Sequence, residues 1–266
     1  MDVVIDKISA GYSEDAPIVK DVSLRATEGE VTTLLGPNGC GKSTLLKAMS
    51  RLLFPSSGTV RYDGQNIHEL SPRSAAQTVA LLPQHPVCPP GLTVGELVER
   101  GRHPYVKNWW RRAMASDLDM VREALERTDT TELVNRNVAE LSGGQRQRVW
   151  LAMVLAQDTP AVLLDEPTTF LDPAHAMEVL GLVKQLAGRG KTVVMVLHDL
   201  TLAGMFSDQV AVMKAGQIIA KGSPREALTE DVLASAYGLN AEIWEDPVGD
   251  TPIIVPRGTA GDPDRP

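Results

Sequence analysis

The stretch Gly36–Ser43, with the sequence Gly-Pro-Asn-Gly-Cys-Gly-Lys-Ser, constrains this chain more than any other. It fits the pattern G-x-x-x-x-G-K-[ST], in which backbone N–H groups surround phosphate oxygens, a lysine reaches the β- and γ-phosphates and a hydroxyl binds Mg²⁺. Residues 31–35 before it predict a buried strand, and residues 44–49 predict a helix whose positive end faces the phosphates. The pattern therefore predicts a binding site for a nucleoside triphosphate. The residues expected to line this P-loop site are Gly36, Pro37, Asn38, Gly39, Cys40, Gly41, Lys42, Ser43 and Thr44.

Composition and charge indicate which partners and which cellular compartment to expect. The chain has 266 residues and a formal net charge of −8, which disfavours binding to nucleic acid. Its apolar runs, such as residues 193–197, are much shorter than the roughly 20 residues that a membrane-spanning helix needs. The first residues lack the pattern of an export signal, and two cysteines, Cys40 and Cys88, cannot form a disulfide framework. We therefore expect a protein of the reducing cytoplasm.

Apolar strands alternate with helices in much of the chain. Strands are expected at residues 79–82, 161–165 and 192–197, and a helix is expected from Asp172-Pro173 to Gly188. Polar groups follow the carboxyl end of each strand, so the pattern predicts an α/β fold with a mostly parallel sheet and a ligand at that edge.

Other segments predict additions to this sheet. Short strands and turns up to Tyr62 indicate a partly antiparallel lobe, and Ala215-Gly216 predicts a hairpin turn. Thr93-x-x-Glu96 and Ser116-x-x-Asp119 resemble capping boxes that open helices, the second with Leu118 on its apolar face. The tail, residues 256–266, is rich in Gly, Asp, Pro and Arg and is expected to be disordered.

A second glycine-containing stretch, Leu141–Gln145, has the sequence Leu-Ser-Gly-Gly-Gln and begins an apolar helix. A helix start with small residues is another potential anion site. Together with the P-loop, this stretch resembles the ATPase subunits of ABC transporters. The other elements of that family follow in the family's order: Tyr12, Gln84, Asp165-Glu166, Leu171-Asp172 and His198.

The resemblance implies one ABC ATPase domain over residues 1–255. In it, residues 1–84 and 158–255 form the nucleotide-binding core and β lobe, and residues 85–157 form an inserted helical subdomain that contains the Leu141–Gln145 motif.

Adjacent side chains at a strand end point to opposite sides, so Asp165 and Glu166 are expected to have different roles. Asp165, with Ser43 and Gln84, is expected to bind Mg²⁺, whereas Glu166 is expected to act on the attacking water. The resemblance assigns catalytic roles to Glu166, to Lys42 and to His198, which would contact the γ-phosphate. An exposed acidic turn is the alternative for an isolated Asp-Glu pair, and an isolated histidine at a strand end is more often structural than catalytic. Their partners here favour the catalytic interpretation.

The resemblance also implies contacts between subunits. Ser142, Gly143, Gly144 and Gln145 would contact ATP bound to the opposite subunit of a homodimer that forms on ATP binding, and Asp172 would belong to the D-loop. Tyr12 is expected to stack on adenine, although a tyrosine at a strand end can equally be part of the core or its rim. The helical subdomain would receive permease subunits at the cytoplasmic face of a bacterial membrane, served indirectly by a substrate-binding protein.

Finer resemblance lies in residues 92–105, 168–172 and 246–252, which are similar to importers of iron chelates, namely siderophores. Haem and cobalamin importers are close alternatives. A soluble ABC ATPase of a cofactor-assembly complex would carry the same motifs. A small-molecule kinase would share only the P-loop. The aromatic and basic cluster at Trp109-Trp110 could meet a permease or lipid headgroups, or pack on its own subdomain.

Overall fold

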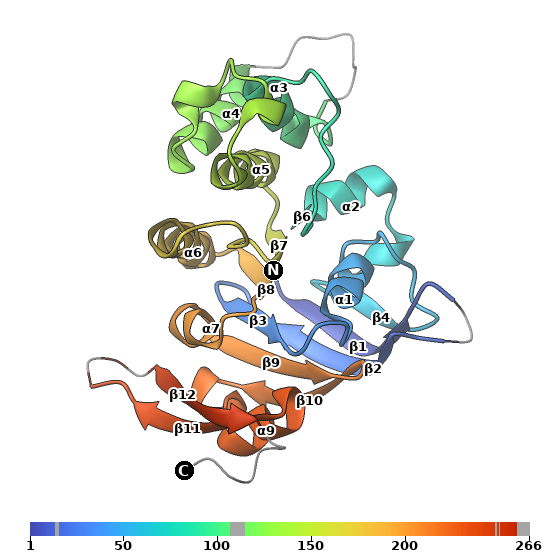
Figure 1. Ribbon diagram of the computed structural model, residues 1–266. Helices are drawn as coiled ribbons and strands as arrows, with labels where there is room; N and C mark the ends of the chain where they lie inside the picture. Colours follow the sequence, from blue (N-terminus) through green and yellow to red (C-terminus); the bar gives the residue numbers. More distant parts are fainter. Residues whose placement is uncertain (14–15, 107–114, 248, 250, 260–266) are drawn as a thin grey trace.

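The computed structural model describes residues 1–13, 16–106, 115–247, 249 and 251–259 (Figure 1). The Trp109-Trp110 cluster lies outside the described residues. Six strands form the central sheet: β3 Val31–Leu35, β6 Val79–Leu82, β7 Ala161–Asp165, β8 Thr192–Val196, β9 Gln209–Lys214 and β10 Gln217–Gly222. Their order is β10-β9-β3-β8-β7-β6. The first five in chain order are mutually parallel, and β10 pairs antiparallel with β9.

The register of the central sheet determines where the site lies. Leu34 of β3 pairs with Val196 of β8, and Val196 also pairs with Asp165 of β7. The carboxyl ends of these three parallel strands therefore meet at one edge of the sheet. Because the P-loop follows β3, Glu166 follows β7 and His198 lies two residues after β8, the three segments meet there.

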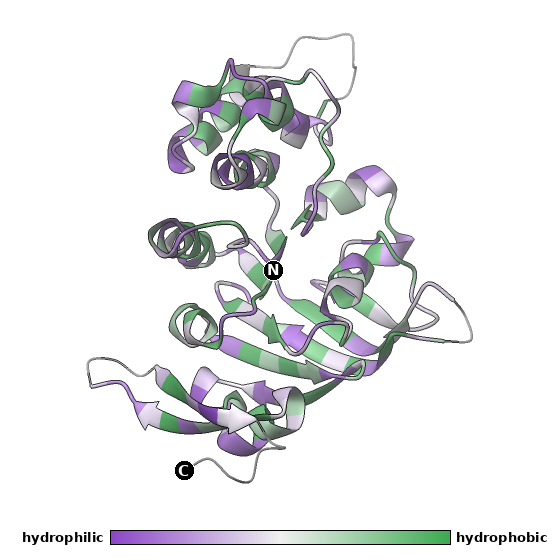
Figure 2. Ribbon diagram, in the orientation of Figure 1, coloured by the Kyte–Doolittle hydropathy of each residue, from purple (hydrophilic) through white to green (hydrophobic). Residues whose placement is uncertain are grey.

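Burial on both faces explains why β3, β7 and β8 are nearly continuous apolar runs. Every residue of these strands is buried, and Figure 2 shows the middle of the sheet as hydrophobic. Alternate side chains enter two separate cores: Leu35 and Met195 enter one, and Leu34 and Val194 enter the other. Helices α5 and α6 cover the first core, while α1 and the antiparallel strands cover the second.

The expected antiparallel lobe is confirmed. It consists of β1 Val3–Ala10, β2 Val19–Ala26, β4 Ser57–Tyr62 and β5 Gln65–Asn66, in the order β2-β1-β4-β5. The β4–β5 turn has φ values of 45° at Asp63 and 83° at Gly64, and the β9–β10 turn has 48° at Ala215 and 87° at Gly216. Two successive positive φ values are the geometry of the tight turn that the Gly-containing pairs predict.

The helices surround these sheets. They are α1 Lys42–Met49, α2 Pro72–Thr78, α3 Val94–Glu99, α4 Ala115–Arg127, α5 Gly143–Gln157, α6 Pro173–Gly188, α7 Leu200–Phe206, α8 Pro224–Ala227 and α9 Glu230–Tyr237. Short 3₁₀ turns are η1 Ile67–Glu69, η2 Arg100–Arg102, η3 Thr131–Leu133 and η4 Val138–Glu140. Helices α3, α4 and α5 form a separate group at the top of Figure 1, beyond α6 and α2. No helix in the described part of the chain combines the length and the apolar character needed to cross a bilayer.

The predicted start of α4 is wrong. The helix already includes Ala115, so Ser116 lies inside it and is not its N-cap. Its inward face also differs from the prediction, because Leu118 is 50% exposed whereas Asp117 is buried. The Oδ1 atom of Asp117 accepts a 2.9 Å hydrogen bond from Nε of Arg102. A largely buried arginine needs a counter-charge, and α4 is oriented to supply one.

The prediction of a disordered tail from residue 256 is wrong for residues 256–259. The last strands, β11 Leu239–Glu245 and β12 Pro252–Thr259, pair antiparallel, so the chain remains in a strand for three residues after Pro256. The aliphatic residues of β12 explain the error: Ile254 pairs with Ile243 and packs against the core, which holds the strand beyond the Gly- and Pro-rich boundary. Residues 260–266 lie outside the described part.

Candidate nucleotide-binding and hydrolysis site

All three glycines of the P-loop have positive φ values, a backbone geometry that other residues rarely adopt, and Gly39 has a φ of 77°. Gly36 has a φ of 143° and Gly41 a φ of 111°. A Cβ atom on Gly36 would lie 2.2 Å from the carbonyl oxygen of Met213 and 2.8 Å from Sγ of Cys40. The loop is thus pressed against β9, and α1 begins directly after Gly41. This arrangement places the amino end of α1 beneath the loop, where it favours a bound anion.

Lys42 is buried at the base of the loop. Its Nζ atom donates hydrogen bonds to the carbonyl oxygens of Gly36, at 2.7 Å, and Pro37, at 3.0 Å. An ammonium group held by two neutral carbonyls has spare charge for a phosphate oxygen. The thiol of Cys40 lies 3.9 Å from the same nitrogen and is buried. The loop residues therefore fit a triphosphate, with Lys42 as the cation.

Ser43 and Asp165 are side by side. Oγ of Ser43 donates to Oδ1 of Asp165 at 3.2 Å, across the junction of α1 and β7. Burial raises the pKa of Asp165, and the hydrogen bond from Ser43 opposes the shift. A hydroxyl and a carboxylate are oxygen ligands of the kind that Mg²⁺ prefers when phosphates complete its shell. The described ranges contain no group of three or more His, Cys, Asp or Glu side chains that could hold a metal ion.

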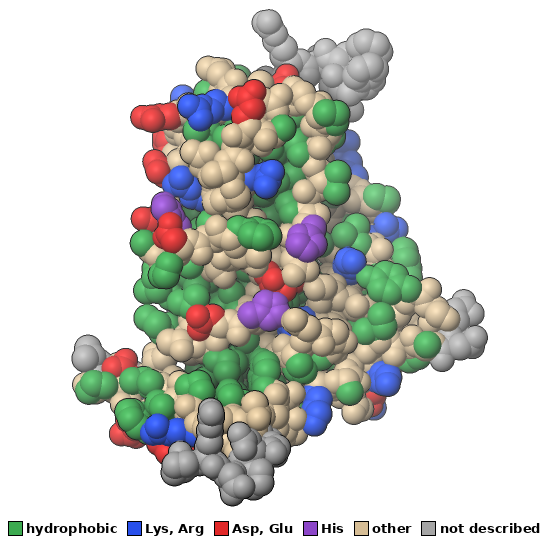
Figure 3. Space-filling model, in the orientation of Figure 1, with side chains coloured by type: hydrophobic (Ala, Val, Ile, Leu, Met, Phe, Trp, Pro, Cys, Tyr) green, Lys and Arg blue, Asp and Glu red, His purple; other side chains and the backbone are tan. Residues whose placement is uncertain are grey.

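Glu166 faces away from Asp165 and contacts His198. Nε2 of His198 lies 2.5 Å from Oε1 of Glu166, and the Thr169 hydroxyl donates to Oε2 at 3.1 Å. Partial burial raises the pKa of Glu166, but hydrogen bonds from His198, Gln84 and Thr169 outweigh it and hold the pKa below its usual value. Glu166 is thus ionised at neutral pH and able to accept a proton. Figure 3 shows histidine and acidic side chains together at the centre of one face.

The backbone at Glu166 explains the divergence of the two carboxylates. Asp165 is the last residue of β7, whereas Glu166 has a φ of 56°. A positive φ is uncommon for a residue with a side chain, and such strain concentrates at functional sites. The turn directs Glu166 toward the end of β8, where His198 lies.

Not all predicted residues are brought together. Gln84, expected beside Ser43 and Asp165, has its side chain hydrogen-bonded to Glu166 instead. Tyr12 is 65% exposed, and its hydroxyl accepts a 2.9 Å hydrogen bond from Nζ of Lys47 of α1. The exposed ring is accessible to a stacking partner.

Sequence reasoning missed the contacts of Lys47 with Tyr12 and of Thr169 with Glu166. The available signal for Thr169 was a hydroxyl three residues after Glu166.

The Leu141–Gln145 motif forms the start of α5. Ser142 is its N-cap and makes a reciprocal capping box with Gln145. Residues 142–145 share a pocket of about 410 Å³ with Asp172 and Phe170. A Cβ atom on Gly143 would lie 3.3 Å from the Cβ of Phe170, so the motif is packed against the segment after β7. Within the described residues that line this pocket, none belongs to the P-loop.

Comparison with known proteins identifies the family. The model of the family described as ABC transporter matches residues 19–169, which is more than half of the chain. The chain belongs to the ABC transporter family. ATP binding and ATP hydrolysis coupled to transport follow from this membership, as the sequence predicts.

Curated relatives are similar over nearly the whole chain. The achromobactin transport ATP-binding protein CbrD of Dickeya dadantii is 46% identical over 95% of this chain and 93% of its own. The iron(3+)-hydroxamate import ATP-binding protein FhuC of Bacillus subtilis is 44% identical over 94% and 93%. The hemin import ATP-binding protein HmuV of Nocardia farcinica is 42% identical over 90% and 82%.

Solved structures confirm the ABC ATPase fold. A metal-chelate type ABC transporter in an inward-facing conformation matches with a TM-score of 0.81 and 25% identity, covering 96% of both chains. A dimeric bacterial ABC transporter cassette matches with a TM-score of 0.74 and 29% identity, covering 84% of this chain and 99% of the other.

Proposed function

We propose that this chain is the ATP-hydrolysing subunit that powers import of an iron chelate, of the siderophore type, through a separate permease. The observation that carries this proposal is a group of relatives that are 40–46% identical over about 95% of the chain. Their names are for transport of achromobactin, of a siderophore, of petrobactin, of iron(3+)-hydroxamate and of ferric enterobactin. Haem import is the second candidate, because hemin import proteins are 40–42% identical over 90–91% of the chain.

In the proposed hydrolysis, each side chain acts from the position described above. Lys42 moves from the carbonyls of Gly36 and Pro37 to a phosphate oxygen. Ser43 and Asp165 would hold Mg²⁺, which would supply positive charge beside the phosphates. Glu166 accepts the proton of the attacking water, and His198, in contact with Oε1, orients that carboxylate. Tyr12 stacks on the adenine ring.

The active form is a homodimer that closes on ATP. The Ser142–Gln145 pocket is formed without P-loop residues among those described, so a nucleotide there would have to be presented by another chain. The solved dimeric cassette supports this arrangement. Asp172, in the same pocket and N-cap of α6, would contact the second chain.

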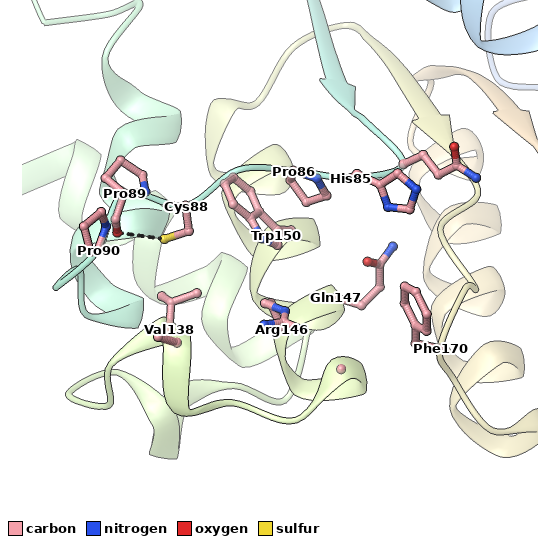
Figure 4. Close-up of a pocket in the computed structure, with 13 residues that line it drawn as sticks. His85, Pro86, Cys88, Pro89, Pro90, Val138, Arg146, Gln147, Trp150 and Phe170 are labelled. Carbon is pink, nitrogen blue, oxygen red and sulfur yellow. Dashed lines mark hydrogen bonds between the residues drawn. The ribbon is translucent and has the colours of Figure 1, made fainter.

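A groove of about 430 Å³ between the helical group and the core is the proposed contact for the permease. It is lined by the segment after β6 and by one side of α5, and Figure 4 shows Trp150 of α5 beside the segment that carries Pro86 and Cys88. Nε1 of Trp150 is buried and has no hydrogen-bond partner among the described residues. The chain would then be peripheral at the cytoplasmic face, and a substrate-binding protein would contact only the permease.

The test is cargo transport by the whole assembly. The chain is co-expressed with the permease encoded beside it, purified with it and reconstituted in vesicles with the cognate binding protein. ATP-dependent uptake of a ⁵⁵Fe-labelled siderophore, lost in Glu166→Gln, is the expected result. Uptake of haem or cobalamin without uptake of the siderophore would show that the chain serves a haem or cobalamin importer instead. An ATPase that co-purifies with no membrane protein would indicate the soluble alternative.

A further inference from the structure

A cavity of about 560 Å³ lies at the amino ends of β7 and β8, at the edge of the sheet opposite the P-loop. Its walls come from α4, the end of α5, residues 158–160 and the turn between α6 and β8. Figure 1 shows α4 and α5 on one side of α6, so the cavity lies where the helical group meets the core. None of the roles proposed above uses this cavity.

Positive charge exceeds negative charge in the cavity wall. Lys191 is paired: its Nζ atom donates to Oδ1 of Asp158 at 2.8 Å. Arg127 of α4 and Arg189 after α6 instead share one carboxylate oxygen, Oε1 of Glu123, at 3.8 and 3.4 Å. Two guanidinium groups thus share one carboxylate oxygen, and Asp158, which also attracts Arg127, is already paired with Lys191. The chain as a whole has a net charge of −8.

The guanidinium of Arg127 is incompletely paired among the described residues. Its side chain is only 18% exposed, and its contact with Glu123, at 3.8 Å, is too long for a hydrogen bond. Nη2 of Arg127 is buried and has no hydrogen-bond partner in the described part of the chain. A guanidinium has five N–H donors, and leaving buried donors unsatisfied is unfavourable. Burial, and then repulsion from Arg189, lowers the pKa of Arg127.

The cavity also has an apolar wall. Leu155, Val162 and Leu186 line it beside the two arginines. A wholly inorganic ion would leave this wall in contact with water. A small organic anion would place its oxygens on the guanidinium groups and its carbon skeleton on the apolar wall.

We propose that this cavity is an allosteric site for a small multivalent oxyanion, a polycarboxylate or phosphate compound, held by Arg127 and Arg189. The two arginines project from different parts of the molecule: Arg127 from α4 in the helical group and Arg189 from the core. An anion held by both fastens these parts together. Arginine suits this role because its planar fork binds carboxylate or phosphate with two parallel hydrogen bonds.

Helix α5 connects this cavity to the nucleotide chemistry. Its last turns, with Val154 and Leu155, line the cavity, and its first residues belong to the Ser142–Gln145 motif. With 15 residues and about 1.5 Å of rise per residue, α5 separates the two by roughly 20 Å. Restraining one end of a rigid helix against the core restrains the other end as well. The bound anion therefore slows ATP turnover, and this second part of the inference rests on the hydrolysis role proposed above.

The first experiment measures binding alone. The full chain is saturated with MgADP, so that the P-loop is filled, and is titrated by calorimetry with tricarballylate and, separately, with inorganic phosphate. Saturable binding of tricarballylate with one site per chain is expected. Arg189→Gln, at a position whose side chain is 57% exposed, should weaken it about tenfold, as should Arg127→Gln. Glu123→Gln should tighten it several-fold, because it removes the carboxylate that competes for both arginines.

The matched control is Arg122→Gln. Arg122 is on the same helix, pairs with Asp119 and does not line the cavity, so this variant makes the same change of charge and should bind the anion like the wild type. The absence of saturable binding for both anions, or equal affinity in the wild type, Arg189→Gln and Glu123→Gln, would overturn the site. Saturation by phosphate alone supports the oxyanion site and excludes the organic ligand.

The second experiment measures ATP turnover at saturating tricarballylate and fixed free Mg²⁺. Turnover several-fold lower in the wild type, but not in Arg189→Gln, is expected. Binding without any change in turnover would retain the site and reject its regulatory role. Because binding is measured without hydrolysis or transport, the failure of the anion site is distinguishable from failure of the proposed import function.

Discussion

Replacing Glu166 by glutamine removes the proton acceptor and leaves the shape of the side chain and its hydrogen bonds in place. The carboxylate is 11% exposed and contacts the His198 ring and the Thr169 hydroxyl. In Glu166→Gln the amide oxygen can still accept from His198, and the Thr169 hydroxyl can reverse to accept from the amide nitrogen. The side chain therefore keeps its position, while its ability to accept a proton from water is lost.

The expected loss in turnover follows from the general-base role. General-base catalysis contributes typically 10²–10⁴-fold, which corresponds to about 3–5 kcal/mol of activation free energy at 1.36 kcal/mol per tenfold. ATP affinity should change little, since Lys42 and Ser43 are untouched. Phosphate release from the purified variant, with nucleotide binding measured in parallel, tests both statements. Glu178→Gln, the same change at an exposed position of α6, is the control and should hydrolyse ATP normally.

Oligomeric state gives the second readout of this variant. Light scattering of Glu166→Gln should show a monomer without nucleotide or with ADP, and a dimer with ATP, because unhydrolysed ATP joins two chains through Ser142 and Gly144. Adding Ser142→Arg should abolish the dimer by filling the Ser142–Gln145 pocket with a bulky side chain. A Glu166→Gln protein that binds ATP tightly yet remains monomeric would refute the two-chain arrangement, and one that retains full turnover would refute the assignment of the base.

Three further predictions concern other groups. Lys42→Ala should weaken ATP binding strongly, whereas Asp165→Asn should retain nucleotide and lose Mg²⁺-dependent turnover; small and equal effects in both assays would contradict these roles. Alkylation of Cys40 should inactivate and ATP should protect, because an adduct on this buried thiol occupies the loop, and Cys40→Ser should be active and resistant to the reagent. Burial lowers the pKa of His68 from 6.5, so its neutral form contributes stability that is present above pH 6.5 and is lost as the pH falls through the lowered folded value. The thermal midpoint should therefore fall less steeply between about pH 7 and pH 5 in His68→Gln than in the wild type.

Local sequence signals predicted much of the fold. Asp172-Pro173 and Gly188 define α6, because an N-cap followed by proline fixes a helix start independently of the rest of the chain. The Thr93-x-x-Glu96 capping box is likewise present. The P-loop and the carboxyl ends of β7 and β8 converge as expected, since the rules of parallel sheets place them at one edge.

Long-range contacts account for what could not be predicted. The orientation of α4 depends on a salt bridge between Asp117 and Arg102, and no local pattern signals a carboxylate on a buried face. The position of Gln84 beside Glu166 depends on how the segment after β6 crosses the sheet edge. Strand β12 extends past Pro256 because it pairs with β11, and a composition-based boundary ignores such a partner.

The capping box at the start of α5 limits which amino acids can replace Ser142. Oγ of Ser142 accepts from the backbone N–H of Gln145 at 3.2 Å, and the Gln145 side chain accepts from the backbone N–H of Ser142 at 3.1 Å. The oxygen of Ser142 therefore accepts from the helix backbone, while the hydroxyl hydrogen remains available for donation to another group. The Ser142 side chain thus caps the helix and can also donate a hydrogen bond. Ser142→Ala removes both the cap and the donor, at about 1 kcal/mol of helix stability. Ser142→Asp preserves the cap but places a negative charge where a phosphate would bind. Of serine, alanine and aspartate, only serine provides both the cap and a neutral donor. Position 142 should therefore tolerate fewer substitutions than its exposure to solvent alone suggests.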